Sequence, residues 1–309
     1  MKKPVKSSII TVVVFTAALF GIYSCLNVSH KGIVDNLSGN WLGDSESDQQ
    51  VTEYAVAQPI NSIYVQWDSG SLYVSSGDES DVKIRELSDE TLQIKQHLNY
   101  HIANNILYIS NGSTSDSSLF HFSKPKIDCE IYVPADMLQD GADSITVSTT
   151  KADVQISQIR IPILSVTTES GSVFFDQVFA ERMTVVTASG KITSDNGVSN
   201  VIECISQSGT IAINDVCSDL ILKATSGDIS AAPDSIFMRA DISTVSGNIN
   251  LTLPESSGMK MNINEGSGSF DCEFDVLTSG GYYIYKNGKI PLNIKTTSGS
   301  IQLYKGKTN

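Results

Sequence analysis

Hydrophobic and polar residues alternate with a period of two on both sides of a recurring Ser-Gly pair. Between Leu164 and Ile211 one phrase occurs three times, as Val-Thr-Thr-Glu-Ser-Gly-Ser-Val, Val-Val-Thr-Ala-Ser-Gly-Lys-Ile and Cys-Ile-Ser-Gln-Ser-Gly-Thr-Ile. A period of two is typical of β-strands that bury one face. Each phrase therefore predicts two half-buried strands joined at a turn, and the glycine predicts a turn residue with a positive φ.

The Ser-Gly pair recurs at a nearly constant spacing through the second half of the chain. When the serine is numbered zero, positions −6, −4 and +3 are apolar in every copy, and position +5 in most copies. Lys151-Ala152 replaces Ser-Gly in a degenerate first copy, which makes eight copies, and Ser69-Gly70 obeys the same rule further upstream. The serines of the regular copies are Ser170, Ser189, Ser208, Ser226, Ser246, Ser267 and Ser298.

Two architectures use alternating strands joined by tight turns. An antiparallel sandwich would place each Ser-Gly at a hairpin tip, and nothing in it would require a constant repeat length. In a β-solenoid each rung stacks on the next at about 4.8 Å, so equivalent positions become neighbours. The constant period and the uniform columns therefore predict an all-β chain, folded as a β-solenoid of about 19-residue rungs.

The predicted domain boundaries follow from where this pattern begins and where it is interrupted. Residues 59–144 form an irregular N-terminal β part, and residues 145–309 form the repeat solenoid. Within the irregular part, strand-like stretches lie at residues 82–87, 92–98, 106–110 and 127–133.

The longest interruption of the repeat lies between Ser267 and Ser298. It predicts a hairpin insertion near residues 279–290, with Asn287-Gly288 as the turn. The insertion carries an aromatic cluster, which either caps the open end of the solenoid or forms a patch for glycan or protein contact. The cluster consists of Tyr282, Tyr283 and Tyr285.

The chain opens with a short basic segment, and residues 8–26 then form an uncharged, mostly apolar run. This pattern predicts an N-terminal membrane-targeting helix, with the rest of the chain on the extracytoplasmic side of the cell membrane. Within residues 1–28 three outcomes stay open: a retained single N-terminal anchor, a lipoprotein signal ending at Cys25, and cleavage with secretion. Residues 29–58 lack both helical and strand periodicity and predict a flexible tether.

Charge and cysteine usage restrict the partners and the chemistry. The formal net charge of −13 repels phosphate backbones, so we expect no nucleic acid, and a cell-envelope protein or glycan is the expected partner. The chain has no Cys-x-x-Cys pair, so no zinc site and no cofactor is predicted. The cysteines of the domain fall at inward positions and predict inert core thiols. They are Cys129, Cys204, Cys217 and Cys272.

The set of repeated phrases resembles a known family. The repeated Thr-x-Ser-Gly-x-Ile/Val, an early Gln-Trp-Asp-Ser-Gly-Ser-Leu and a middle Glu-Ile-Tyr-Val-Pro are similar to the bacterial putative-adhesin domain family of unknown function, over roughly residues 60–305. The resemblance implies a single-stranded β-helix, commonly tethered outside the membrane, with no catalytic residues. Lys151-Ala152 and Glu265 depart from the family pattern and predict locally weaker turns.

These observations favour a membrane-tethered, extracytoplasmic β-solenoid that acts as a non-catalytic binding, adhesion or envelope-associated scaffold module. Hydroxyls of turn residues such as Thr187 and Ser189 either form a contact face or hydrogen-bond neighbouring turns. The alternative is a polysaccharide lyase or hydrolase, which needs paired carboxylates. The outward acids share no column that stacks carboxylates over several rungs. Asp228 and Asn248 alone supply too few oxygens for Ca²⁺. No catalytic, cofactor-binding or metal-binding residue is therefore assigned.

Overall fold

The computed structural model describes residues 49–112, 125–233, 236–256 and 258–306. Most of these residues lie in β-strands and only one short helix occurs among them, α2 (Ala135–Asp140), so the predicted all-β fold is confirmed. In the described ranges, no helix has the length and apolar character needed to cross a membrane. The predicted N-terminal helix and Cys25 lie outside the described residues.

The strands fall into three groups along the chain. The N-terminal strands are β1 (Gln50–Val56), β2 (Ser62–Trp67), β3 (Ser71–Gly77), β4 (Val82–Ser88), β5 (Asn99–Ala103), β6 (Ile106–Ser110), β7 (Ile127–Pro134) and β8 (Ser144–Thr149). The long central strands are β9 (Asp153–Thr168), β10 (Val173–Thr187), β11 (Ile192–Ser206) and β12 (Ile211–Ala224). The C-terminal strands are β13 (Ile229–Ala231), β14 (Ile236–Ser243), β15 (Ile249–Pro254), β16 (Met259–Asn264), β17 (Phe270–Cys272), β18 (Leu277–Ser279), β19 (Tyr282–Tyr285), β20 (Ile290–Lys295) and β21 (Ile301–Gly306).

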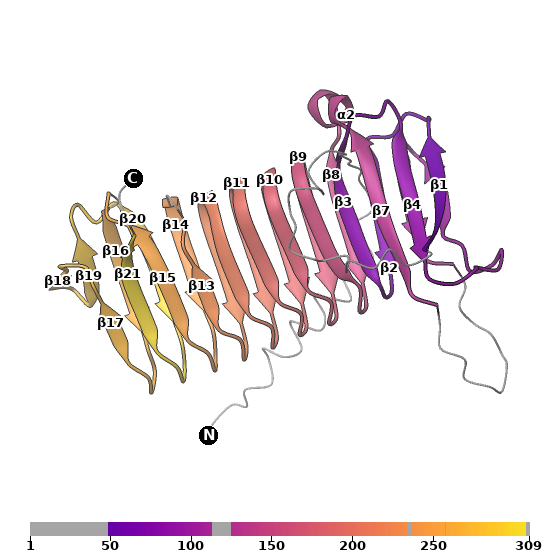
Figure 1. Ribbon diagram of the computed structural model, residues 1–309. Coiled ribbons are helices and arrows are strands. Elements are labelled where there is room, and N and C mark those ends of the chain that lie inside the picture. Colours follow the sequence, from indigo (N-terminus) through magenta and orange to yellow (C-terminus); the bar gives the residue numbers. More distant parts are fainter. Residues whose placement is uncertain (1–48, 113–124, 234–235, 257, 307–309) are drawn as a thin grey trace, which may run out of the picture.

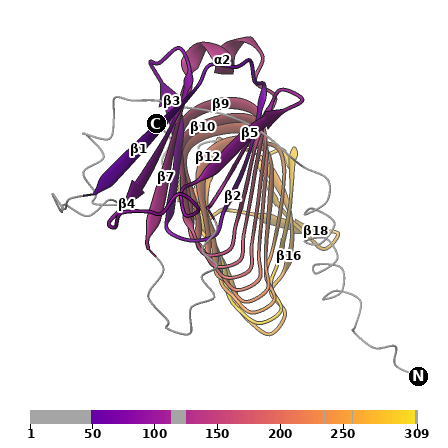
Figure 2. The same ribbon diagram turned by 90° about the vertical axis from the view of Figure 1, so that its right-hand side faces the viewer.

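Each rung consists of a strand that ends at a Ser-Gly corner and a strand that begins after it. Strands of the first kind stack into one sheet face, the pre-corner face, and strands of the second kind stack into the post-corner face. The central strands β9 to β12 pair parallel and in register on both faces. Figure 1 shows this stack from the side, and Figure 2 shows the rungs nested behind one another. The chain is thus an open, solenoid-like stack of rungs.

The predicted apolar columns become ladders of direct neighbours. On the pre-corner face, position −6 brings Leu164, Met183 and Ile202 side by side, and all of them are fully buried. The hydrophobic core lies between the two faces and runs the length of the stack. Burial of these repeated apolar side chains is the main force that holds one rung on the next.

A second corner, which the sequence pattern did not predict, lies in the middle of β9, β10 and β11. Gln158, Gln177 and Asn196 have positive φ angles of 56°, 55° and 61°. The left-handed backbone turns each strand from the post-corner face to the pre-corner face of the following rung. These amide residues are nineteen positions apart, so the signal was present in the sequence, but Gln is not a usual marker of a turn.

The glycines of the regular corners do not have the predicted positive φ; Gly171, Gly190 and Gly209 all lie outside that region. Their role is close backbone approach. A Cβ added to Gly190 would lie 1.8 Å from the carbonyl oxygen of Gly171, and one added to Gly209 would lie 1.9 Å from that of Gly190. Because real Cβ atoms never approach an oxygen so closely, glycine is required by the neighbouring rung and not by the turn itself.

At the N-terminal end the order of rungs in space differs from the order in sequence. Strand β2 lies between β6 and β8 on the pre-corner face. On the post-corner face β3 lies between β7 and β9. The rung made of β6 and β7 therefore lies outside the rung made of β2 and β3, although it follows that rung in the sequence.

The same exchange of order occurs at the C-terminal end, where the last rung in sequence lies inside the stack. Strand β20 lies between β14 and β16, and β21 lies between β15 and β17. Figure 1 shows the yellow strand β21 between β15 and β17. The prediction that each of the eight rungs stacks on the next is thus correct from Lys151 to Ser246 and wrong at the C-terminal end.

Antiparallel strands cover the outermost rungs. At the N-terminal end β4 pairs with β7 and β1 pairs with β4, while β5 pairs with β6. At the C-terminal end β19 pairs with β16, and β18 pairs with β19. These strands turn the parallel stack into an antiparallel sheet at each end.

Three local predictions are corrected by these end structures. The tether predicted at residues 29–58 is too long, because Gln50–Val56 form β1. The strand predicted at residues 92–98 is a loop and turn. The hairpin predicted at Asn287-Gly288 is wrong, because β19 and β20 lie on opposite sides of β16. The hairpin turn lies instead at Gly280 and Gly281, between β18 and β19.

Candidate functional site

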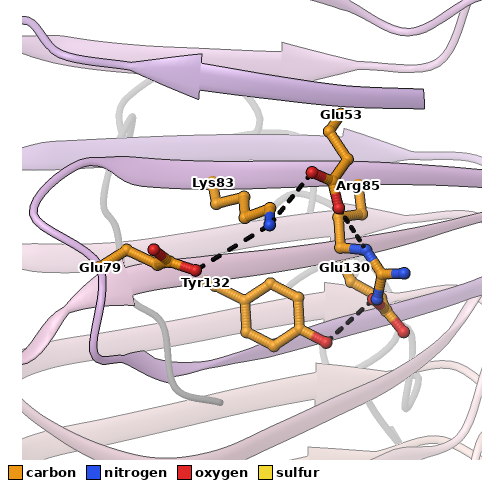
Figure 3. Close-up of polar contacts among 6 residues, drawn as sticks. All are labelled: Glu53, Glu79, Lys83, Arg85, Glu130 and Tyr132. Carbon is orange, nitrogen blue, oxygen red and sulfur yellow. Dashed lines mark hydrogen bonds and ion pairs between the residues drawn. The ribbon is translucent and has the colours of Figure 1, made fainter. Parts of the chain in front are cut away.

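The largest group of interacting charges lies on the outer surface of β1, β4 and β7 (Figure 3). Arg85 is paired across the strands with Glu53 on one side and Glu130 on the other, at 3.1 and 2.5 Å. Lys83 Nζ lies 3.1 Å from the second oxygen of Glu53, and its hydrogen bond lowers the pKa of Glu53. Tyr132 donates a hydrogen bond to Glu130, and burial together with that carboxylate raises the pKa of Tyr132.

This network suits a structural role better than a chemical one. Directly opposed charges stabilise one register of an antiparallel sheet, and a slip by one residue would move each charge to the other face. Both cations contact carboxylates, and each of the three carboxylates, Glu53, Glu79 and Glu130, contacts a cation, so these charges are used within the network. The network therefore fixes how β1 and β4 are attached to the first rung.

A buried acid lies on the inner side of the same sheet. Glu86 accepts a hydrogen bond from the backbone N–H of Leu98 at 2.6 Å, and its other oxygen lies 2.6 Å from Nδ1 of His97. Tyr54 donates to the same carboxylate at 3.3 Å, and burial beside Glu86 raises the pKa of Tyr54 to about 12. Glu86 thereby binds the loop that was predicted as a strand, and the loop's backbone donor is satisfied by a side chain.

Cys129 lies opposite Glu86 in the adjacent strand, so this corner contains a thiol, an imidazole and a carboxylate. These are the groups of a nucleophilic cysteine site. However, burial and the nearby carboxylates raise the pKa of the Cys129 thiol far above its ordinary value. Since the thiolate is the reactive form, this environment is the opposite of one that activates a cysteine.

The other cysteines follow the same logic. Cys204 and Cys217 are free, buried thiols, and burial raises the pKa of Cys217 to about 12. Cys272 is half-buried and also free. The prediction of core thiols is thus confirmed for Cys129, Cys204 and Cys217.

The hydroxyls of the Ser-Gly corners are used within the corners. Thr187 Oγ1 accepts the N–H of Gly190 at 2.8 Å, and Thr168 and Ser206 make the equivalent bonds. The exposed Ser189 donates to a carbonyl of the preceding rung at 3.3 Å. Of the two interpretations left open by the sequence, hydrogen bonding between neighbouring turns is confirmed for Ser189, whereas Thr187 bonds within its own corner.

The polar residues after the corner glycines also connect successive rungs. Asp228 Oδ1 accepts the N–H of Asn248 at 2.7 Å, and Asn248 Oδ1 accepts the N–H of Ser300 at 3.0 Å. The oxygens considered for Ca²⁺ thus replace backbone acceptors. Among the described residues, no group of three or more His, Cys, Asp or Glu side chains is arranged to hold a metal ion.

A set of acids near the second corner is the part of the stack closest to a glycosidase-like arrangement. Asp176 and Asp195 are direct neighbours on adjacent strands. Each is hydrogen-bonded to an amide: Asn196 Nδ2 donates to Asp176 at 2.9 Å, and Asn214 Nδ2 donates to Asp195 at 2.6 Å. The carboxylate column is thus limited to two rungs and is tied to internal donors.

Asp215 continues this group into the interior, and sequence reasoning missed it. The rung from Ser208 to Ser226 is one residue shorter than its neighbours, which produces a bulge beside Gly197. Asp215 fills the gap: it accepts the N–H of Gly197 at 2.9 Å and the hydroxyl of Ser194. Burial raises the pKa of Asp215, and the hydrogen bonds partly oppose that shift. Two features of the sequence could have indicated this contact: the shorter repeat, and Ser194 in an otherwise largely apolar column.

The tyrosine cluster at the C-terminal end divides between two faces. Tyr283 and Tyr285 are register partners of the buried Met261 and Met259, and their rings contact Phe270 and Phe274 with centroids 4.9 and 4.8 Å apart. In β19 the intervening residues project to the other side. Tyr282 therefore faces outward, where Lys260 lies over its ring. Two of the tyrosines cap the core, and the third is part of an outer surface.

Comparison with known proteins agrees with this fold. The family model of the Toastrack DUF4097 domain matches residues 60–304. A putative lipid binding protein from Parabacteroides distasonis has 12% sequence identity and a TM-score of 0.54, with 83% of this chain and 97% of that chain covered. A putative adhesin from Bacteroides fragilis has 13% identity and a TM-score of 0.51, with 82% and 96% covered. No curated protein matches the chain.

Proposed function

The chain belongs to the Toastrack DUF4097 family, and we propose that it acts outside the cytoplasm as a non-catalytic binding module, tethered to the cell membrane by its N-terminal segment. The proposal combines three separate elements: the absence of activated chemical groups among the described residues, the tether, and the ligand class. Each has its own support and its own test.

The observation that carries the proposal is the use made of the buried reactive groups. Glu86 binds a loop, Asp215 fills a bulge, and the pKa of the Cys129 thiol is raised. Acid–base and nucleophilic catalysis need a group held toward a substrate with its pKa matched to its task. In the described part of the chain, these groups hold the fold together instead.

The tether is supported by the apolar run at residues 8–26 and by the position of β1. Strand β1 is paired only to the antiparallel end sheet, at the end of the stack opposite the β18–β19 hairpin (Figure 1). A tether joined to β1 would hold the stack by its N-terminal end. The long faces and the C-terminal hairpin would then extend away from the membrane.

The expected ligand is a protein or glycan of the cell envelope. The net charge of −13 opposes binding to nucleic acid and to anionic lipid headgroups. The names putative adhesin and putative lipid binding protein belong to the similar structures, which support the fold alone. A stack of rungs offers a long, regular surface, which solenoid proteins use for binding.

Cell fractionation tests the tether. The full chain is expected in the membrane fraction of cells, where protease added outside the intact cells should digest it. In the control, lysines replace Val12 and Val13 in the apolar run, and each lysine in a spanning helix opposes insertion by about 3 kcal/mol. The control is expected in the soluble fraction. A wild-type chain that stays soluble, or that is protected from protease, contradicts the tether.

A retention assay tests the non-catalytic role. The full chain in detergent is applied to immobilised envelope polysaccharide and to immobilised envelope proteins, and both the bound protein and any released sugar are measured. Retention without new reducing ends or unsaturated sugars supports the proposal. Release of such products favours the alternative, a polysaccharide lyase or hydrolase.

A further inference from the structure

The two ends of the stack differ in how their edge strands are protected. At the N-terminal end the outer strand β1 carries Glu53, which is paired with Lys83 and Arg85. At the C-terminal end the outermost strand of the sheet is β18, and among the described residues its only strand partner is β19. Sheet edges are usually protected by charge, proline or a bulge. Strand β18 reads Leu-Thr-Ser, and no charged residue occurs from Leu277 to Tyr285.

The hairpin turn determines which backbone groups of β18 are free to bind. Gly280 and Gly281 have φ angles of 57° and 80°, which is the two-residue turn that favours tight hairpins. In such a hairpin the residues flanking the turn, Ser279 and Tyr282, exchange their backbone hydrogen bonds. The pattern then alternates, so the N–H and C=O of Thr278 point away from β19.

The side chains around this edge form a mostly apolar outer surface, which Lys260 borders. Leu277 is the register partner of Ile284, and Ser279 is the register partner of Tyr282, so all of them project to the outer side with Lys260. Leu277 is 76% exposed and Tyr282 is 37% exposed. On the inner side Tyr283 and Tyr285 close the core. The inner side of this edge thus packs on the core, and its outer side is exposed to solvent.

We propose that this C-terminal edge binds a second copy of the chain. Strand β18 of one copy pairs antiparallel with β18 of the other about a twofold axis at Thr278. The two Thr278 residues then exchange a pair of backbone hydrogen bonds, and Leu277 of each copy lies opposite Ser279 of the other. The pairing joins the pre-corner faces of two stacks end to end.

A second copy fits this edge better than an unrelated partner because the edge is self-complementary. A twofold contact requires one surface to match itself, and a strand centred on one outward-bonding residue does so. The uncharged hairpin also allows two chains of net charge −13 to meet without placing like charges in contact. The contact is short, so we expect a weak, reversible association. It goes beyond the proposed function and does not depend on the membrane tether.

Covalent capture in the full chain tests the contact. A photo-crosslinking amino acid replaces Leu277 in chains that carry two different epitope tags and are expressed together. The matched control has the same amino acid at Val51, which is 44% exposed on β1 at the other end. The expected product is a species of twice the chain mass that carries both tags, formed from position 277 and not from position 51. Capture of monomer only, or of a different protein only, overturns the proposal.

A second substitution tests the strand pairing itself. Thr278→Pro removes the outward N–H, while Thr278→Val keeps it. In chains with the crosslinker at position 277, the yield of the double-tagged species should fall at least fivefold for Thr278→Pro and stay unchanged for Thr278→Val. Thermal unfolding of both variants should match wild type, because Thr278 lies outside the core. If a folded Thr278→Pro chain crosslinks as well as wild type, the backbone pairing is wrong.

Discussion

In the middle of the stack, from β9 to β12, neighbours in space are neighbours in sequence, whereas at each end the first or the last rung of the chain lies between two other rungs. In the middle, residues pair with their equivalents in the adjacent rungs, except at the bulge beside Gly197, so the same packing is repeated from rung to rung. At the ends the same ladders continue, but the chain reaches them by a different path.

The exchange of order places the first and the last rung of the chain inside the stack. The first rung, β2 and β3, and the last rung, β20 and β21, each have a rung on both sides. The outermost rungs are instead inner segments of the chain. A terminal repeat of an ordinary solenoid contacts one neighbour and can fray. Here the first and the last rung cannot leave the stack without breaking two interfaces, which protects them from fraying.

The strongest test of the middle is a charge in the core. Ile211 is buried in the +3 column, and Ile211→Asp should reduce the free energy of unfolding by more than about 4 kcal/mol, because an unpaired carboxylate would be enclosed by apolar rungs. The measurement is thermal unfolding followed by circular dichroism. Ala212→Asp, at the adjacent, partly exposed position, is the control and should change little. An unchanged melt for Ile211→Asp would sink the assignment of this column to the core.

The corner glycines give the next largest effect. Gly209→Ala should reduce stability by about 3 kcal/mol, since the new Cβ would meet a carbonyl oxygen of the adjacent rung. Gly280→Ala is the contrast: its φ is positive but no atom lies within 4 Å of an added Cβ, so a loss of about 1 kcal/mol is expected. Ser208→Ala should lose less than about 1 kcal/mol. If Gly280→Ala were the more damaging glycine change, the corner would depend on φ and not on close approach.

The exchanged end is tested by comparing two equivalent leucines. Leu292 lies in the last rung in sequence, Leu220 lies at the same −6 position of a middle rung, and both are buried. Each Leu→Ala substitution should therefore reduce the free energy of unfolding by about 2 to 3 kcal/mol. Denaturant unfolding of the two variants measures the difference. A loss below about 0.5 kcal/mol for Leu292→Ala alone would mean that the last rung frays as a terminal repeat does.

The apolar columns and the positions of the Ser-Gly corners could be predicted because each residue of the repeat lies beside its equivalents in the adjacent rungs. An apolar residue at −4 meets apolar residues at −4, so one phrase gives the contacts of the whole ladder. The order of rungs at the C-terminal end could not be predicted this way. Ile242, Ile263 and Ile294 occupy the same column and are interchangeable as neighbours, so the pattern fits either order equally well. What decides the order is the β18–β19 hairpin on the outer edge of β16.

The contacts of the candidate polar groups could not be predicted from the sequence for a related reason. Glu86 and His97 lie in a non-repeating part, and their contact depends on how a loop folds over the first rungs. Hydrogen bonding of a corner hydroxyl to a neighbouring turn, as Ser189 makes, was among the predicted alternatives, whereas the bond that Thr187 accepts from the glycine N–H of its own corner was not. Repetition predicts what is shared between rungs, and the exceptions are set by single contacts between distant residues.

Asp215 gives the smallest effect and the most selective one, because it fills the bulge between β11 and β12. Burial raises its pKa in the folded chain, so its contribution to stability is full below the ordinary pKa and is lost as pH rises through the folded value. Asp215→Asn removes this titration and keeps an acceptor for the N–H of Gly197. The variant should match wild type near pH 3 and be more stable at pH 7, by no more than about 1 kcal/mol. Thermal unfolding at both pH values measures this difference. A variant that is less stable at pH 7 would show that the ionised carboxylate, held by Ser194 and Gly197, stabilises the bulge more than its burial opposes it.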